Sequence, residues 1–147
     1  MSTGAVISFY ETTLPEGEQK HLVTINKHWD GYPDDQGVGM KLAMLLTSGK
    51  LVNGISVGDR LHTVWNGAGC LAAAFIKKIK DKVGDVYIVP EDAMVGQEYT
   101  YIVRVYADLS HRVDVHEGYD VKPSAENMTF SGSFEQFLQW CKEYGHE

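Results

Sequence analysis

The chain contains 147 residues, of which 44% are hydrophobic and 22% are charged, and its formal net charge is −7. This composition excludes an intrinsically disordered chain, and no apolar run approaches the roughly 20 residues that span a bilayer. The length corresponds to one domain that can bury about two-thirds of the surface of its unfolded chain. We therefore expect a single globular domain over residues 1–147.

The charge is unevenly distributed along the chain. Residues 1–84 contain 9 Lys or Arg against 8 Asp or Glu, whereas residues 85–147 contain 4 against 12. The acidic C-terminal half argues against direct binding to nucleic acid, because a phosphate backbone requires clustered cations. Two distant cysteines, Cys70 and Cys141, form neither a disulfide framework nor a zinc motif. Free thiols and the lack of a secretion signal predict a cytoplasmic protein without membrane contact.

The first half of the chain predicts a hairpin followed by two helices. Residues 4–10 and 20–27 are rich in β-forming residues, and the Pro-Glu-Gly sequence at 15–17 between them is typical of a turn. Apolar residues at helical spacing then predict one helix that ends at Gly49 and a second that begins near Asn66 and ends at Gly84. These residues are Val38, Leu42, Leu45 and Leu46 in the first helix and Leu71, Phe75 and Ile79 in the second.

The second half predicts three strands and a C-terminal helix. Residues 86–89 form a short strand before Pro90, and residues 98–107 alternate strongly enough to predict a long strand. Residues 113–116 repeat the alternation as its antiparallel partner, and Ser133 is placed to cap a final amphipathic helix. The expected fold is α+β, with a mainly antiparallel sheet of about five strands and about three helices in one domain.

The segment from Lys27 to Asp35, with sequence KHWDGYPDD, is the first candidate site. It lies between a predicted strand and a predicted helix, where loops commonly present polar groups. One interpretation is structural: the two aromatic side chains close the end of the core while Asp30 caps the turn. A metal site built from the histidine and the carboxylates is an alternative, although the spacing matches no standard cage. The candidate ligand-binding residues here are His28, Trp29, Asp30 and Tyr32.

A second candidate site lies at the start of the second predicted helix. Gly67 and Gly69 allow backbone N–H groups to face outward at a helix N-terminus, which favours an anion. An ordinary cap at Asn66 explains the same residues. Because both candidate loops precede helices, we expect them to face one another across one end of the sheet and to share a pocket. The aromatic rings would stack on a base and the amides would hold a phosphate. The candidate ligand-binding residues here are Trp65, Asn66, Gly67 and Gly69.

Cys70 supports a catalytic hypothesis as an alternative. A thiol in the first turn of a helix is favoured as thiolate, and His28 or His62 could act as the base of a cysteine-nucleophile hydrolase. However, cysteine is among the most frequently buried residues, and Cys70 precedes an apolar run. We therefore expect a buried structural thiol, and we assign no catalytic residue, metal ligand or cofactor.

The hexapeptide from His28 to Pro33 resembles the H-[WY]-D-G-Y-P signature of small proteins carried by bacteriophages and prophages. The segments 66–70 (NGAGC) and 130–134 (FSGSF) are also similar to such proteins. This resemblance implies the cytoplasm of an infected cell as the compartment. It also implies an accessory protein that counters host defence, either by binding a defence protein or by sequestering its nucleotide signal.

Taken together, these features predict a binding protein rather than an enzyme. The expected partner is a host protein or a small anionic or nucleotide ligand, and a homo-oligomer could build the pocket across its interface. A further alternative is a protein inhibitor without a ligand pocket, which would use an acidic surface in the C-terminal half. Charge reversal at Asp114, Glu117 and Asp120 would separate these hypotheses.

Overall fold

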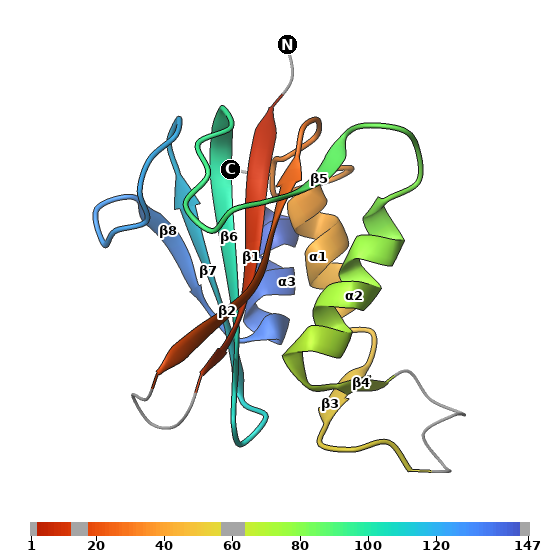
Figure 1. Cartoon of the computed structure of the whole chain (residues 1–147). Coiled ribbons are helices and arrows are strands. Elements are labelled where there is room, and N and C mark those ends of the chain that lie inside the picture. Colours follow the sequence, from red (N-terminus) through yellow and green to blue (C-terminus); the bar gives the residue numbers. More distant parts are fainter. Residues whose placement is uncertain (1–2, 13–17, 57–63, 145–147) are drawn as a thin grey trace.

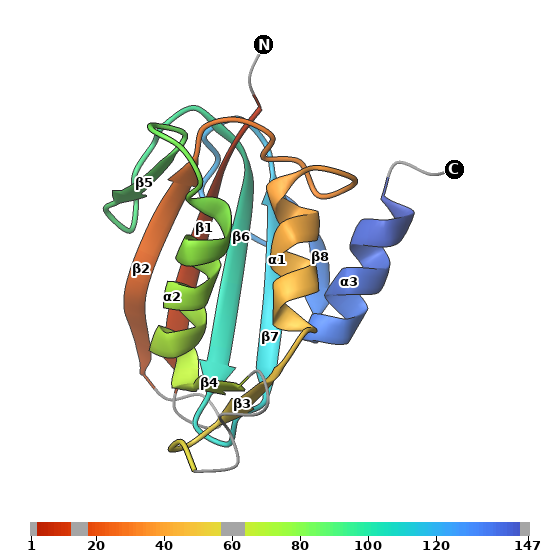
Figure 2. The same cartoon turned by 90° about the vertical axis from the view of Figure 1, so that its right-hand side faces the viewer.

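The computed structural model describes residues 3–12, 18–56 and 64–144 of the chain. One six-stranded sheet carries three helices on one of its faces, and a two-stranded sheet lies at one end (Figures 1 and 2). The α+β class and the mainly antiparallel sheet are therefore as predicted. The elements in chain order are β1 (Gly4–Thr12), β2 (Gln19–Lys27), α1 (Val38–Leu46), β3 (Lys50–Val52), β4 (Val64–Asn66), α2 (Gly67–Ile79), β5 (Val86–Val89), β6 (Gln97–Tyr106), β7 (His111–Glu117), β8 (Met128–Gly132) and α3 (Phe134–Glu143).

The large sheet has the strand order β5-β2-β1-β6-β7-β8. Adjacent strands in this sheet are antiparallel except for the central pair, β1 and β6, which is parallel. The predicted hairpin is formed by β1 and β2, although its expected turn at 15–17 lies outside the described residues. Strands β3, β4 and β8 were not predicted, because they are too short to show a clear alternation of apolar and polar residues.

The hydrophobic core lies between the sheet and the helices. Alternate residues of the central strands point into it, including Ile7 and Phe9 of β1 and Tyr101 and Val103 of β6, all of which are fully buried. Burial of one such large apolar side chain stabilises the fold by about 1.5–3 kcal/mol. The helices supply the other side of the core through Leu42, Leu46, Leu71, Phe75 and Phe137.

Helix α3 begins as the sequence predicts. The Ser133 hydroxyl accepts a hydrogen bond from the Gln136 N–H at 3.2 Å, and the Gln136 side chain accepts one from the Ser133 N–H at 2.8 Å. This reciprocal capping box satisfies two N–H groups that the helix itself leaves free. It fixes the point at which the chain leaves β8 and packs Phe137 onto the core.

The direction of the helices determines where candidate sites can form. Helices α1 and α2 run in opposite directions across the sheet, so their N-termini lie at opposite ends of it (Figure 2). The chain reverses between them through β3 and β4, which pair in parallel. Within residues 3–12, 18–56 and 64–144, no helix has the length and apolar character needed to cross a membrane.

Candidate functional site

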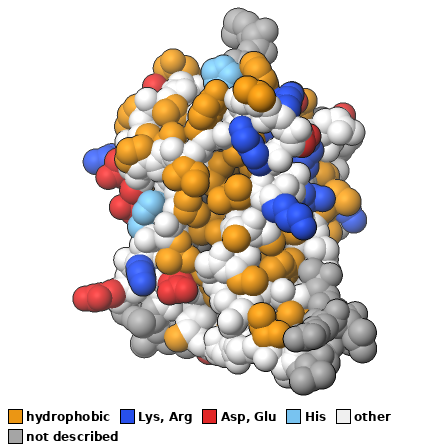
Figure 3. Space-filling view, turned by 45° about the vertical axis from the view of Figure 1, so that its right-hand side comes forward, with side chains coloured by type: hydrophobic (Ala, Val, Ile, Leu, Met, Phe, Trp, Pro, Cys, Tyr) orange, Lys and Arg blue, Asp and Glu red, His pale blue; other side chains and the backbone are white. Residues whose placement is uncertain are grey.

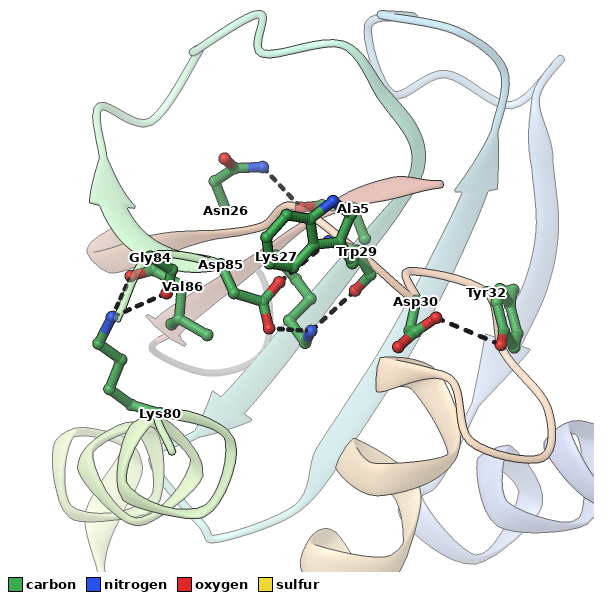
Figure 4. A network of polar contacts seen from close by, with 10 residues as sticks. All are labelled: Ala5, Asn26, Lys27, Trp29, Asp30, Tyr32, Lys80, Gly84, Asp85 and Val86. Carbon is green, nitrogen blue, oxygen red and sulfur yellow. Dashed lines mark hydrogen bonds and ion pairs between the residues drawn. The ribbon is translucent and has the colours of Figure 1, made fainter. Parts of the chain in front are cut away.

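A buried ion pair anchors the start of the segment that contains the HWDGYP hexapeptide. Lys27 Nζ lies 2.5 Å from Asp85 Oδ2, and both side chains are almost completely buried (Figure 4). Lys27 Nζ also donates to the Trp29 carbonyl at 2.8 Å, while the Trp29 N–H donates to Asp85 Oδ1 at 3.0 Å. The loop after β2 is thereby fixed to the turn between α2 and β5, which lies 58 residues further along the chain.

The protonation of Asp85 follows from these contacts. Burial alone raises the pKa of a carboxyl group, because the charged form loses its hydration. Here the hydrogen bonds from Lys27 and from the Trp29 N–H outweigh burial and hold the pKa of Asp85 below its ordinary value. Asp85 is therefore a carboxylate, and its charge faces the Lys27 Nζ inside the protein.

The middle of the hexapeptide has a structural role. Asp30 adopts a left-handed conformation with φ of 57°, and its carbonyl accepts a hydrogen bond from the N–H of Val38, the first residue of α1. Gly31 donates to the Thr3 carbonyl at 2.8 Å and accepts from the Tyr101 hydroxyl at 2.8 Å. A Cβ atom at Gly31 would lie only 2.7 Å from the backbone of β1, so this close approach requires glycine. The backbone of the loop is consequently held by the first residue of α1, by the chain just before β1 and by Tyr101 of β6.

The aromatic residues of the hexapeptide do not close the core as the structural interpretation expected. Trp29 is 42% exposed, and His28 and Asp30 are also exposed. The ring of Trp29 packs edge-on against the His28 ring and lies under the Lys82 ammonium, 5.1 Å from the ring centroid. Tyr32 is half-buried, and its hydroxyl makes only a long 3.4 Å contact to Asp30. The hexapeptide therefore presents an exposed indole on an immobilised backbone.

Other exposed apolar side chains accompany Trp29 near the β5 edge of the sheet. Val83 is 97% exposed, Ile88 is 71% exposed and Tyr87 is also exposed. Lys80 lies over the Tyr87 ring, as Lys82 does over Trp29. Figure 3 shows hydrophobic side chains gathered on this side of the molecule, with Lys or Arg side chains along the margin. We call the exposed side chains at and beside this edge the apolar–lysine patch. They are Trp29, Lys80, Lys82, Val83, Tyr87 and Ile88, of which Tyr87 and Ile88 are successive strand residues that project to opposite faces of β5.

The outer edge of β5 is partly closed to strand pairing. The Val86 N–H donates to the Gly84 carbonyl at 2.7 Å. Lys80 Nζ donates to the carbonyls of Gly84 and Val86 at 2.9 and 3.3 Å (Figure 4). A lysine that covers edge carbonyls is a common protection against addition of a further strand. Contacts at this edge are therefore expected through side chains rather than through the backbone.

Comparisons with protein-family models, with curated proteins and with solved structures find no match for this chain. A function is therefore inferred from the geometry of the patch and from the sequence features described above.

The second predicted site lies at the far end of the sheet, so the expected shared pocket is wrong. Gly31 bonds to the chain at the start of β1, whereas Gly67 lines a cavity together with Thr12, at the end of β1. The cause is the antiparallel arrangement of α1 and α2, which the spacing of glycines does not reveal. Trp65 is only 3% exposed and belongs to the core, so it offers no ring face for stacking.

The cavity beside Gly67 measures about 440 Å³, but its lining does not favour an anion. Its charged residues are Glu11, Glu18 and Lys20, so carboxylates outnumber cations. Asn66 does not cap α2 with its side chain and instead accepts a hydrogen bond from the Gly54 N–H at 2.8 Å. Gly69 is exposed. At this end of the sheet, the glycine-flanked helix N-terminus is therefore present without the predicted aromatic platform, because Trp65 is buried.

The prediction that Cys70 is a buried thiol is wrong, because Cys70 is exposed and Cys141 is buried. Burial raises the pKa of Cys141 to about 12. His28 lies at the opposite end of the sheet from Cys70 and cannot act as its base, and His62 lies outside the described residues. Among the described residues, no group of three or more His, Cys, Asp or Glu side chains is arranged to hold a metal ion.

The three carboxylates proposed for an acidic binding face are occupied by structural contacts. Asp114 is buried and forms ion pairs with Arg104 and Arg112. Glu117 accepts a hydrogen bond from a tyrosine hydroxyl at the end of α3, and Asp120 accepts two from backbone N–H groups before and at the start of β6. Charge reversal at these positions would disturb the fold, so it cannot separate the binding hypotheses.

Sequence reasoning also missed the buried ion pair and most of the patch. Asp85 and Lys27 are far apart in the chain, and no local pattern links them. A signal was nevertheless present for the apolar members, because Val83, Tyr87 and Ile88 lie around a strand of only four residues next to several lysines. Such a short strand can bury few of its own side chains.

Proposed function

We propose that this protein is a binding protein that docks on an acidic surface of a partner protein through the apolar–lysine patch. The observation that carries the proposal is the exposed Trp29, whose backbone is fixed on both sides by the buried Lys27–Asp85 ion pair. Tryptophan is among the residues that dominate binding energy at interfaces. A rigid backbone lowers the entropy lost on binding, so this indole is suited to act as an anchor.

The charge around the anchor supports an acidic partner. Lys80 and Lys82 belong to the patch, and Lys77 and Lys78 lie in the adjoining last turn of α2. The exposed carboxylates beside them are Asp81 and, next to Trp29, Asp30, so the four lysines outnumber the carboxylates. Although the whole chain carries a net charge of −7, this region is therefore positive. Such a field accelerates association with an acidic surface and disfavours a basic one.

The resemblance of residues 28–33 to phage and prophage proteins supports a more specific proposal. In this proposal the partner is a host protein, and its binding interferes with host defence against phage. The role against host defence is supported by the hexapeptide, whereas docking is supported by the patch. Either can therefore be wrong without the other.

Substitution of Val83 tests both proposals with little risk to the fold. Val83 is almost fully exposed, so Val83→Glu leaves the core unchanged and places a carboxylate in the patch. Tyr119→Glu is the matched control, because Tyr119 is also exposed but follows β7, away from β5. Each variant is expressed in bacteria that carry one defined defence system, and the plating of sensitive phages is measured.

We expect the wild-type protein and Tyr119→Glu to restore plating on at least one defended host, and Val83→Glu to fail on that host. If the wild-type protein changes plating on none of them, the role against host defence is contradicted. If Val83→Glu is as active as the wild-type protein, the patch is not the docking surface.

A further inference from the structure

Two Asn-Gly sequences lie side by side at the end of the molecule opposite β5 (Figures 1 and 2). Asn53 and Gly54 follow β3, whereas Asn66 ends β4 and Gly67 begins α2. Strands β3 and β4 are paired, with Val52 next to Asn66 in the register. The Gly54 N–H donates a hydrogen bond to Asn66 Oδ1 at 2.8 Å. The backbone of one Asn-Gly sequence is therefore bonded to the side chain of the other.

An asparagine that precedes a glycine can lose its side-chain amide without an enzyme. The backbone nitrogen of the glycine first gives its proton to hydroxide and then attacks the side-chain carbonyl carbon, Cγ. The new C–N bond closes a five-membered succinimide ring, the Cγ–Nδ2 bond breaks, and ammonia leaves after taking a proton from water. A water molecule then opens the ring at either carbonyl and yields aspartate or isoaspartate. Glycine favours the reaction, because it has no Cβ atom to obstruct the attack and its backbone turns freely.

The surroundings of Asn53 permit this reaction. Its side chain is exposed, and within the described part of the chain no hydrogen bond holds it. Gly54 has a φ of 90°, and nothing lies within 4 Å of the position that a Cβ atom would take there. The Asn53–Gly54 peptide lies outside the helices and strands, so its rotation disturbs no regular element. The structure therefore leaves both the side chain and the following peptide room to move.

Asn66 is protected by its backbone conformation. Its ψ is 78°, which places the Gly67 nitrogen on the opposite side of the Cα–C bond from the side chain. Attack on Cγ would require a large rotation about this bond. Gly67 is the first residue of α2 and Ala68 behind it is 1% exposed, so the rotation would displace the first turn of the helix from the core. The side chain of Asn66 is also held by the Gly54 N–H.

We propose that Asn53 is a deamidation site and that Asn66 controls the rate of its reaction. The contact that does so is the hydrogen bond from the Gly54 N–H to Asn66 Oδ1, because Gly54 must lose this proton before its nitrogen can attack. The bond stabilises the protonated nitrogen and restrains the peptide. Deamidation places a carboxylate on the wall of the cavity beside Gly67, which Asn53 lines together with Glu11 and Glu18. The modified cavity is consequently more acidic.

Peptide mass spectrometry of the folded protein after incubation in a mildly alkaline buffer tests the site, because each deamidated asparagine gains a fixed mass. Digestion with pepsin in acid prevents further reaction during the analysis. The urea-unfolded chain supplies the intrinsic rates at positions 53 and 66. We expect the folded protein to deamidate at Asn53 while Asn66 is strongly slowed relative to its intrinsic rate. Reaction mainly at Asn66, or none at Asn53, in the folded protein overturns the proposal.

Two substitutions test the control by Asn66. Asn66→Asp keeps an oxygen that can accept the Gly54 N–H, whereas Asn66→Ala removes it, and neither variant can deamidate at position 66. Since a neutral hydrogen bond corresponds to a factor of about two to ten, Asn53 should deamidate faster by this factor in Asn66→Ala than in Asn66→Asp. Urea denaturation establishes that both variants are folded during the incubation. Equal rates in the two folded variants overturn the control by Asn66.

Hydrogen exchange in the wild-type protein gives a readout that needs no substitution. The Gly54 N–H should exchange more slowly than it does in the unfolded chain, because exchange and deamidation both require loss of the same proton. Exchange of the Gly54 N–H at the unfolded rate would contradict the control by Asn66, even if Asn53 is the residue that deamidates.

Discussion

Replacement of Asp85 by asparagine would test the anchor that holds Trp29 in place. Asparagine tolerates the φ of 65° found at this position, and its side-chain oxygen can still accept the Trp29 N–H. The change instead leaves the Lys27 ammonium buried without a counter-charge. Loss of one partner of a buried ion pair costs about 3–5 kcal/mol, which is a large part of the roughly 5–15 kcal/mol that stabilises a typical domain.

The free energy of unfolding should be measured by urea denaturation at pH 7 for the wild type, Asp85→Asn, Lys27→Met and the double variant. Both single variants should be strongly destabilised, and the double variant should lose less than the sum of their losses, because no buried charge then remains unpaired. Asp81→Asn is the control, since Asp81 is exposed. A loss below about 1 kcal/mol in Asp85→Asn would refute a buried pair, because that is the range of surface ion pairs.

The difference in stability between the wild type and Asp85→Asn should depend on pH, and the pKa of Asp85 determines the direction. The pKa of Asp85 in the folded protein lies below its ordinary value of 3.8, because hydrogen bonds from Lys27 and Trp29 outweigh burial. The contribution of this carboxylate to stability is therefore complete above pH 3.8 and is lost as the pH falls through the folded-state pKa. Wild type and Asp85→Asn should consequently converge in stability below pH 3.8. A difference that stays constant there would contradict the assignment.

Three further predictions concern single residues. Gly31→Ala should lower the free energy of unfolding by about 1–3 kcal/mol in a urea titration, because its Cβ would overlap the start of β1; an unchanged midpoint would contradict the close packing. A thiol reagent should label the exposed Cys70 quickly and the buried Cys141 only on unfolding, as mass spectrometry can show; equal rates in the folded protein would oppose this. His111 stacks on Phe134 and accepts its N–H, and burial lowers the pKa of His111 despite the nearby Glu135. The free energy of unfolding should therefore decrease as the pH is lowered below 6.5, because the unfolded state takes up the proton first. The variant His111→Phe should not show this decrease.

Local features of the chain were predictable from the sequence. The first hairpin, the strong alternation of β6 and β7 and the cap at Ser133 all depend on neighbouring residues, so their patterns are visible without the fold. The class of the fold followed from the order of these elements. The parallel pairing of β1 with β6 was not visible, because it joins segments that are far apart in the chain.

The candidate site was only partly predictable. The hexapeptide marked the loop that carries the exposed Trp29, but sequence gives no measure of which tryptophan is buried, and Trp29 and Trp65 have opposite environments. The prediction of a shared pocket was wrong because it required the N-termini of α1 and α2 to lie at the same end of the sheet. The anchor of the site is an ion pair between Lys27 and Asp85, and nothing near either residue identifies the other as its partner.

The central claim is that Trp29 and its neighbours form the docking surface, and site-specific photo-crosslinking tests it most directly. A photoreactive phenylalanine analogue is placed at Val83 in the patch and, in a separate protein, at Tyr119 as the control. Both proteins are irradiated in phage-infected bacteria. The account predicts one dominant protein adduct from position 83 that is absent from position 119, and that disappears when Trp29→Ala is added. An identical adduct from both positions, no adduct from position 83, or one that persists in Trp29→Ala would contradict it.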